Sequence, residues 1–430
     1  MERGCYPTMQ RSLIFMCFVS VMLSMMACGN QSPDEKSFEA VWQTVNETHH
    51  DPDFGGIDWK ALLVQYKPQL TAAGSDSDFC TVVNRMLFEL NLSHLLVASH
   101  GDLKLFLPTL FAEGHVGVDL RLIDGSAIIT SITPLSPAAR AGLRPGFVIQ
   151  GINRVSMERI MAEAEKNLIP PYNRRNRLNT ITLRILGHLY GPPGTPVTIM
   201  YRDGQGVQHE KTLARVSRGQ GKVHSAALPP FFIECESRRL AHNVGYIRFN
   251  HFAAPVDKQF RDILALMQDA PGLIIDLRGN SGGYFKVVDT IAAHLLLEKT
   301  LFCRFKYRAE TVDVVIDPVQ DAYRGPVVVL VDALTMSASE HFAGCLQSLK
   351  RAVIIGEQSP GYLLCANWMM LPNGAAFMHT IAEPRTHGGK VIEGVGVMPD
   401  ISVTLERDAL LQGRDLQLDE AVAYIRKHKE

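Results

Sequence analysis

The sequence has few cysteines and no excess of charge of either sign, and each shortage excludes a class of protein. Its 430 residues include 43 basic and 44 acidic side chains, so the formal net charge is −1. A nucleic-acid-binding protein usually has a strongly basic surface, and this balance does not favour one. Beyond position 28 the cysteines are odd in number and widely spaced, which supports neither a full disulfide framework nor a zinc site. They are Cys80, Cys235, Cys303, Cys345 and Cys365.

Long apolar runs are also scarce, and the clearest one is too short to span a membrane. It covers residues 13–26, follows Arg11 and falls below the ~20 residues that a transmembrane helix needs. The run therefore predicts a signal peptide, with a buried N-terminal helix as the alternative. It ends at Ala27 and Cys28, a small residue before a cysteine, which resembles a bacterial lipobox. We expect Cys28 to be lipidated and to anchor an exported protein on the periplasmic face of a bacterial membrane.

The rest of the chain is long enough for several domains with an ordinary soluble composition. Hydrophobic residues make up 46% and charged residues 20%, and the length exceeds what one core usually fills. The sequence divides into a signal peptide (1–28), a linker (29–36), a helical N-terminal domain (37–112), a β domain with a helical insertion (113–218), an α/β core (219–405) and a C-terminal helix (406–430).

Three sequence patterns support this division. Apolar residues recur at helical spacing from position 38 to about 88. Short β-type runs such as 127–130 and 197–201 follow, separated by Asp-Gly turns. From position 244 strand-like and helical stretches alternate, which predicts an α/β sheet with helices on its faces. We therefore expect an α+β and α/β multidomain protein.

Within the β domain, residues 137–153 resemble the helix, turn and strand of a PDZ domain. Such domains hold an extended peptide as an added strand, and successive backbone amides receive its terminal carboxylate. Val116, Gly117 and Val118 occupy the position expected for that peptide-binding loop. A helical stretch at 157–167, with a polar segment up to 179, is interpreted as an insertion. The alternative is a small β domain that only packs.

A glycine-rich turn follows a buried strand at residues 276–283 and is the first candidate for chemistry. Gly282 and Gly283 would let backbone amides approach a ligand, as an oxyanion or phosphate site requires. No Gly-Lys-Ser/Thr follows, so the turn is not a P-loop. A purely structural turn is the alternative.

Ser337 stands where the strand at 327–331 gives way to a helix, and it is the second candidate. A serine at a helix N-terminus lies beside free amides and the positive end of the helix dipole, which favour negative charge on an attacked carbonyl. The oxyanion hole would use the amide of Ala338 and one amide of the Gly282 and Gly283 turn. Ser337 also has capping-box spacing to Glu340, so an ordinary N-cap is the alternative.

Four segments occur in the order typical of tail-specific (C-terminal processing) and tricorn-core serine peptidases. They are residues 272–283, 337–340, 356–357 and 394–400. With the PDZ-like region and the helical start, the resemblance covers nearly the whole mature chain. It implies a crotonase-like peptidase core that acts on peptides or unstructured protein termini, without a metal or organic cofactor.

The resemblance also separates two mechanisms. In the processing branch, a lysine about one β-α turn beyond the Gly-Glu strand acts as the base. Residues 356–363 contain no lysine, and Lys390 could act as the base only if it folded back. The tricorn branch uses a histidine preceded by serine, which Ser93 and His94 resemble, and a late glutamate, which falls on Glu393. The resemblance thus implies Ser337 as nucleophile, His94 as base, and Ser93 with Glu393 orienting the base.

Three alternatives stay open in the sequence. His341 lies four residues beyond Ser337 and could reach it along the same helix face. A non-catalytic peptide- or lipid-binding protein could retain this fold, since fold does not guarantee chemistry. A Ser/Lys processing protease is the third. The resemblance also leaves a homo-oligomer open.

Overall fold

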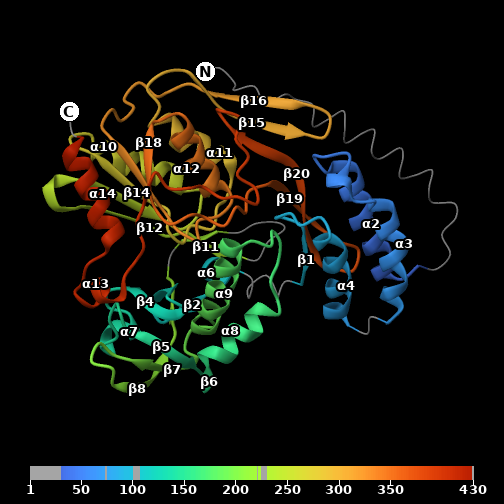
Figure 1. Ribbon diagram of the computed structural model, residues 1–430, viewed down its shortest axis with the longest axis horizontal. Coiled ribbons are helices and arrows are strands. Elements are labelled where there is room, and N and C mark those ends of the chain that lie inside the picture. Colours follow the sequence, from blue (N-terminus) through green and yellow to red (C-terminus); the bar gives the residue numbers. More distant parts are fainter. Residues whose placement is uncertain (1–30, 73–74, 100–106, 220, 224–229, 429–430) are drawn as a thin grey trace.

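The computed structural model describes residues 31–72, 75–99, 107–219, 221–223 and 230–428. The predicted signal peptide and Cys28 lie outside this part of the chain. Among the residues it describes, no helix has the length and apolar composition of a membrane span. The described chain forms a helical N-terminal part, a β domain and an α/β core (Figure 1).

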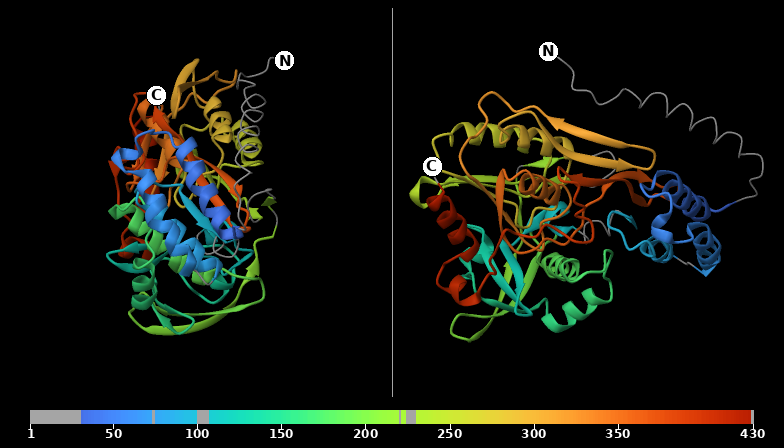
Figure 2. Two further views of the ribbon diagram at one scale, coloured as in Figure 1. Left: turned by 90° about the vertical axis from the view of Figure 1, so that its right-hand side faces the viewer. Right: turned by 45° about the horizontal axis from the view of Figure 1, so that its top comes forward.

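The N-terminal part packs its helices around one apolar core. They are α2 (Pro33–Thr48), α3 (Trp59–Tyr66) and α4 (Asp76–Phe88). Helix α2 begins inside the segment predicted as a linker, because Ser32 and Glu35 form a capping box and Pro33 fits the first helical turn. The core joins buried Phe38 and Phe79 to Phe377 of a later strand. Figure 2 shows these helices, in blue, projecting from one end of the molecule.

After α4 the chain leaves the helices and enters an antiparallel sheet, earlier than the predicted boundary at 112. Strand β1 (Leu96–Ala98) pairs with β20 (Ala376–Thr386), and the sheet has the order β1-β20-β15-β16 with β19 beside β20. Helix α6 (Pro108–Phe111) packs into the core of the α/β part. The remaining strands are β15 (Thr300–Tyr307), β16 (Thr311–Ile316) and β19 (Cys365–Met370).

The β domain contains a sheet of order β3-β4-β5-β7-β8, with β6 (Val155–Ser156) beside β5. Its strands are β3 (Val118–Ile123), β4 (Ser126–Ile132), β5 (Val148–Ile152), β7 (Pro196–Arg202) and β8 (Gln208–Ala214), and its helices are α7 (Pro137–Arg140), α8 (Met157–Glu165) and α9 (Arg174–Leu189). Helix α9 shows that the insertion does not end in a polar segment at 179. Asn173 caps it, and its buried side chains include Ile181 and Ile185. The PDZ-like identity of this domain stays a prediction.

The α/β core is built on a six-stranded sheet of order β12-β13-β14-β17-β18-β21, parallel except for β12. Its elements are β12 (Cys235–Arg239), β13 (Gly245–Phe249), β14 (Leu273–Asp276), β17 (Val327–Val331), β18 (Ala352–Gly356), β21 (Ile401–Ser402), α10 (Val256–Ala265), α11 (Phe285–Ala293), α12 (Ala338–Ser348), α13 (Arg407–Leu411) and α14 (Leu416–Lys427). Helices α10, α11 and α12 cover one face and α14 covers the other, so β17 is buried throughout. The predicted multidomain class with an α/β core is confirmed.

Adjacent strands β14 and β17 point the same way, so the loops after them emerge at one edge of the sheet. Those loops carry the two junctions singled out in the sequence, residues 277–283 and 332–337. This edge is where open α/β sheets place their ligands.

Candidate active site

Ser337 lies between β17 and α12 in a backbone conformation that is rare for a residue with a side chain. Its φ is 57° and its ψ −123°, whereas an ordinary N-cap residue is extended. Its N–H donates to the carbonyl of Tyr362 at 2.9 Å and to Glu340 Oε2 at 3.2 Å. These bonds hold the turn, and the Ser337 hydroxyl contacts His94.

A chain of side-chain hydrogen bonds connects Ser337 to the predicted base and its partners. Ser337 Oγ lies 3.1 Å from His94 Nε2, and His94 Nδ1 lies 2.7 Å from Ser93 Oγ. The Ser93 hydroxyl donates to Glu393 Oε2 at 2.8 Å. The structure therefore brings together all four residues that the resemblance singled out.

The donor and acceptor roles along this chain fix the proton positions on His94. Because the single hydroxyl proton of Ser93 is donated to Glu393, Ser93 Oγ accepts from His94 Nδ1–H. The Nε2 lone pair is then free to accept the proton of Ser337. The arrangement can withdraw that proton without any change of tautomer.

Burial sets the charge of these groups. It lowers the pKa of His94 to about 3, so the imidazole is neutral at neutral pH. Burial raises the pKa of Glu393 to about 7, while hydrogen bonds from the N–H and hydroxyl of Ser93 and from the N–H of Leu363 act in the opposite direction. Of the two, Glu393 is the group that titrates near neutrality.

Glu340 is fully buried, and its carboxyl group binds the loop that faces Ser337 in addition to capping α12. Its Oε1 accepts from the hydroxyl of Ser359 at 2.5 Å and the N–H of Gly361 at 2.7 Å. Its Oε2 accepts from the N–H groups of Tyr362, at 2.8 Å, and Ser337. One carboxyl group thus ties the Ser337 turn to residues 359–362.

The two glycines of the predicted oxyanion turn have different roles. The N–H of Gly282 already donates to Asn280 Oδ1 at 3.0 Å, and a Cβ on Gly282 would lie 2.6 Å from that of Ser337. Gly282 is therefore needed for close packing. Among the described residues, the N–H groups of Gly283 and Ala338 have no hydrogen-bond partner, which leaves them available for an oxyanion.

Asn280 was not singled out in the sequence, yet its side chain connects the glycine-rich turn to the first turn of α12. Its side chain accepts from Gly282 and from the hydroxyl of Ser339 at 2.6 Å, and it donates to the carbonyl of Phe249 at 2.8 Å. Its position in the glycine-rich turn was the only sequence signal.

No lysine is among the described residues that line the cavity at Ser337. The ring of Tyr362, in the stretch where the processing branch has its lysine, lies 4.6 Å from that of His94, centroid to centroid. Lys390 is exposed and lines a cavity with Ser348, at the far end of α12 from Ser337. Within the described part of the chain, the side chain that contacts the Ser337 hydroxyl is thus a histidine and not a lysine.

His341 is a packing residue. It is 1% exposed, its ring lies among those of Phe285, Phe302 and Phe305, and its ring nitrogens approach Cys345 Sγ. It does not contact the Ser337 hydroxyl.

The predicted peptide-binding loop is not part of this site. Val116, Gly117 and Val118 are buried, and the carbonyls of Val116 and Gly117 accept from the N–H groups of Ala138 and Thr133. None of the three is among the residues that line the cavity at Ser337.

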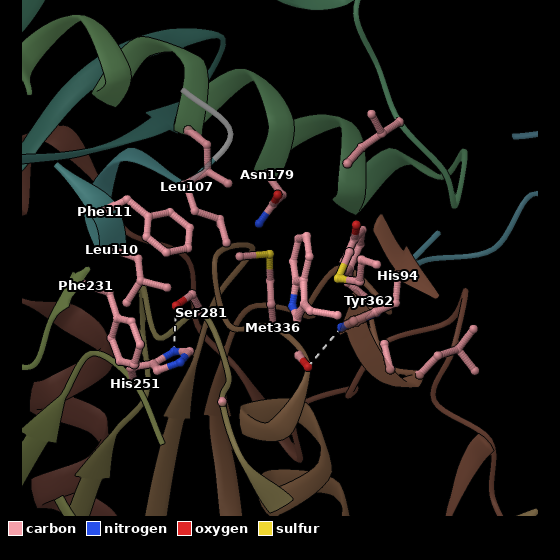
Figure 3. A pocket seen from close by; sticks show the side chains of 18 of the residues that line it. His94, Leu107, Leu110, Phe111, Asn179, Phe231, His251, Ser281, Met336 and Tyr362 are labelled. Carbon is pink, nitrogen blue, oxygen red and sulfur yellow. Dashed lines mark hydrogen bonds between the residues drawn. The ribbon is translucent and has the colours of Figure 1, made fainter. Parts of the chain in front are cut away.

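Ser337 and His94 open into a cavity of about 350 Å³ lined mainly by apolar side chains. Across it from His94 lies a second serine and histidine pair, Ser281 and His251 (Figure 3). No recognisable motif surrounds His251 in the sequence. Its place just after β13, at the edge where the site lies, is the signal that could have identified it.

Much of the chain is similar to known peptidases. Residues 243–403 match Peptidase family S41, and residues 34–88 match the tricorn protease C1 domain. The carboxyl-terminal-processing protease of Picosynechococcus sp. is 34% identical over 382 residues, covering 85% of this chain and 82% of that protein. Its counterpart from Synechocystis sp. is 28% identical over 375 residues, covering 85% and 80%. The solved photosystem II D1 C-terminal processing protease shares the fold, with a TM-score of 0.56, 20% identity and coverage of 89% and 97%.

Proposed function

The chain belongs to Peptidase family S41, the carboxyl-terminal processing serine peptidases, and on this premise we propose that Ser337 is its nucleophile. The observation that carries the proposal is the unbroken series of hydrogen bonds from Ser337 through His94 and Ser93 to Glu393. A serine hydroxyl is a weak nucleophile, and a neutral imidazole within hydrogen-bond distance is what activates it.

In the first step the Ser337 oxygen bonds to the carbonyl carbon of the peptide while its proton moves to His94 Nε2. The resulting oxyanion accepts hydrogen bonds from the N–H groups of Gly283 and Ala338, at the positive end of α12. His94 then gives the proton to the leaving amine, the C–N bond breaks, and an ester to Ser337 remains. Water attacks this ester with His94 as base, which releases the acid and restores Ser337.

Ser93 and Glu393 act through His94 and are positioning residues. Ser93 holds the Nδ1–H tautomer, and ionised Glu393 stabilises the imidazolium that forms during each proton transfer. This relay resembles that of the tricorn branch, and it supports hydrolysis over the alternative of a non-catalytic binding protein.

As substrates we propose peptides and unstructured protein termini. The relatives are named carboxyl-terminal processing proteases, and the cavity beside Ser337 is wide enough for side chains of an extended chain. Delivery of the peptide by the loop at Val116, Gly117 and Val118 is part of the proposal, as is assembly into a homo-oligomer.

Labelling with a serine-reactive fluorophosphonate tests the nucleophile. We expect one label per chain at Ser337, found by peptide mass spectrometry, and none in Ser337→Ala. Labelling of Ser337→Ala to the wild-type extent would contradict the proposal.

We further propose export and lipid anchoring, which rest on the apolar run at 13–26 and on Ala27 before Cys28. Mass spectrometry of protein extracted from membranes should find Cys28 as a diacylglyceryl-modified first residue. An unmodified Cys28 inside an intact N-terminal peptide would contradict this.

A further inference from the structure

The serine and histidine pair opposite His94 has no part in the proposed relay. His251 Nδ1 lies 3.1 Å from Ser281 Oγ, and both residues line the cavity that contains Ser337. Among the described residues no carboxylate contacts this His251 ring, so nothing orients it as a base in the way that Glu393 and Ser93 orient His94. The pair is therefore suited to binding rather than to catalysis.

The position of Ser281 in the loop that carries Gly283 determines which part of a bound substrate the Ser281 and His251 pair contacts. Ser281 is two residues before Gly283, whose N–H is available for the oxyanion, and His94 must face the leaving amine. The residue that supplies the scissile carbonyl, called P1, therefore extends away from His94. Figure 3 shows His251 and Ser281 on that side of the cavity.

The walls around the pair are apolar. Leu110, Phe111 and Phe231 line this side, and the ring of Phe231 meets that of His251 edge to face at 5.5 Å. Arg184 is the charged residue among the described residues that line the cavity, and no Asp or Glu is among them. A lysine or arginine side chain would therefore lose its hydration without gaining a counter-charge. The walls thus favour a large apolar side chain.

The pair itself offers one donor and one acceptor, whichever way its shared proton points. If His251 Nδ1–H donates to Ser281, the serine hydroxyl can donate onward and Nε2 can accept. If the serine donates, Nε2–H is the donor and Ser281 Oγ accepts. Burial lowers the pKa of His251 to about 4, so the ring is neutral at neutral pH and carries no charge for a carboxylate.

We infer that this cavity is the P1 pocket and that Ser281 and His251 make it selective for tyrosine. A tyrosine side chain combines a large apolar ring with a hydroxyl that both donates and accepts, which matches the walls and the pair together. The inference deepens the proposed function and rests on Ser337 being the nucleophile.

The test uses two peptidyl diphenyl phosphonates that differ only in having tyrosine or phenylalanine at P1. The rate of covalent labelling of Ser337 is followed by intact mass. We expect wild type to react about fivefold or more faster with the tyrosine reagent, the factor that one net hydrogen bond supplies. In Ser281→Ala and in His251→Leu this ratio should fall to about one.

Equal rates in wild type would overturn the inference, as would a tyrosine preference that survives in both variants. Faster labelling by a glutamate or lysine reagent than by the tyrosine reagent would overturn it too. Ser281→Ala removes one oxygen only, so it provides the test even where His251→Leu does not fold. Failure of every reagent to label Ser337 would instead contradict the proposed nucleophile.

Discussion

Glu393 accepts hydrogen bonds from both the N–H and the hydroxyl of Ser93, at 2.7 and 2.8 Å, although 300 residues separate the two. Ser93 belongs to the chain just after the N-terminal helices, and Glu393 belongs to the α/β part. The proposed relay therefore exists only when these two parts are docked. A third bond, from the N–H of Leu363 to Glu393 Oε2 at 2.7 Å, anchors the carboxylate on the side of the core.

Ser337→Ala should lower kcat/KM by roughly 10⁴-fold or more, because it removes the nucleophile and only one oxygen atom. The melting temperature should stay within a few degrees of wild type. Peptide hydrolysis and thermal unfolding measure the two effects. Ser348→Ala, at the other end of the same helix, is the matched control and should keep activity. A Ser337→Ala enzyme that retains more than a few per cent of activity would contradict the assignment.

Ser93→Ala should reduce kcat by about 10²–10³-fold while KM changes little, because the variant loses the acceptor that fixes the Nδ1–H tautomer of His94. A group that only stabilised the fold would change the melting temperature instead. Steady-state kinetics together with thermal unfolding separate these outcomes. A fall in kcat of less than about threefold would show that the tautomer is held by other groups.

The pH dependence of activity should report Glu393 rather than His94. Burial raises the pKa of Glu393 to about 7, and ionised Glu393 is the productive form, so kcat/KM should rise with pH through about 7 and then level off. Burial lowers the pKa of His94 to about 3, so the imidazole is already neutral throughout this range. In Glu393→Gln the activity should be lower and the inflection absent. An inflection that persists in Glu393→Gln would assign it to His94.

The sequence was informative where a motif is contiguous. Ser337 follows a strand and opens a helix, so its neighbouring residues made it a candidate. Ser93 and His94 were identified as a dipeptide that resembles the tricorn-type motif. Glu393 depended on the family resemblance, because only the fold brings it within 2.8 Å of Ser93. The difference between Gly282 and Gly283 was also hidden, since it arises from the side chain of Asn280.

Two features could not be predicted, for the same physical reason. Helix α9 has the buried polar residues Asn176 and Asn179, which read as a polar segment but bond to the carbonyls of Ile169, Pro171 and Ala333. His251 and Ser281 are 30 residues apart and meet because β13 and β14 are adjacent and parallel. Polar residues whose partners are distant in sequence give no periodic signal.

Glu340→Gln should destabilise the protein and lower activity. Each carboxyl oxygen accepts two hydrogen bonds, and an amide NH₂ group would face two donors, at a cost of about 1–3 kcal/mol. Burial raises the pKa of Glu340 to about 8, while the hydrogen bonds from Ser359, Gly361 and Tyr362 act in the opposite direction. Thermal unfolding and peptide hydrolysis measure it, with Glu357→Gln as the control. An unchanged melting temperature would contradict the role of Glu340.

Buried histidines lie where the N-terminal helices meet the antiparallel sheet that contains β20. His49 Nε2 and His50 Nδ1 are buried without a hydrogen-bond partner among the described residues, and the two rings stack at 4.6 Å. His50 Nε2 lies 3.8 Å from Glu383 of β20. Burial is the main cause that lowers the pKa of His50 to about 4. The other charged or titratable groups acting on it are His49, Lys306, Asp51 and Arg385.

Acidification should therefore weaken the docking of the part that carries Ser93 and His94. The unfolded chain takes up a proton at His50 near pH 6.5, but the folded protein does so only near pH 4. The stabilisation is complete above pH 6.5 and is lost progressively as the pH falls to about 4, by roughly 3 kcal/mol for this residue. His50→Leu should flatten the fall in melting temperature over this range, and the exposed His387→Leu should not. Equal slopes in wild type and His50→Leu would show that other groups cause the acid sensitivity.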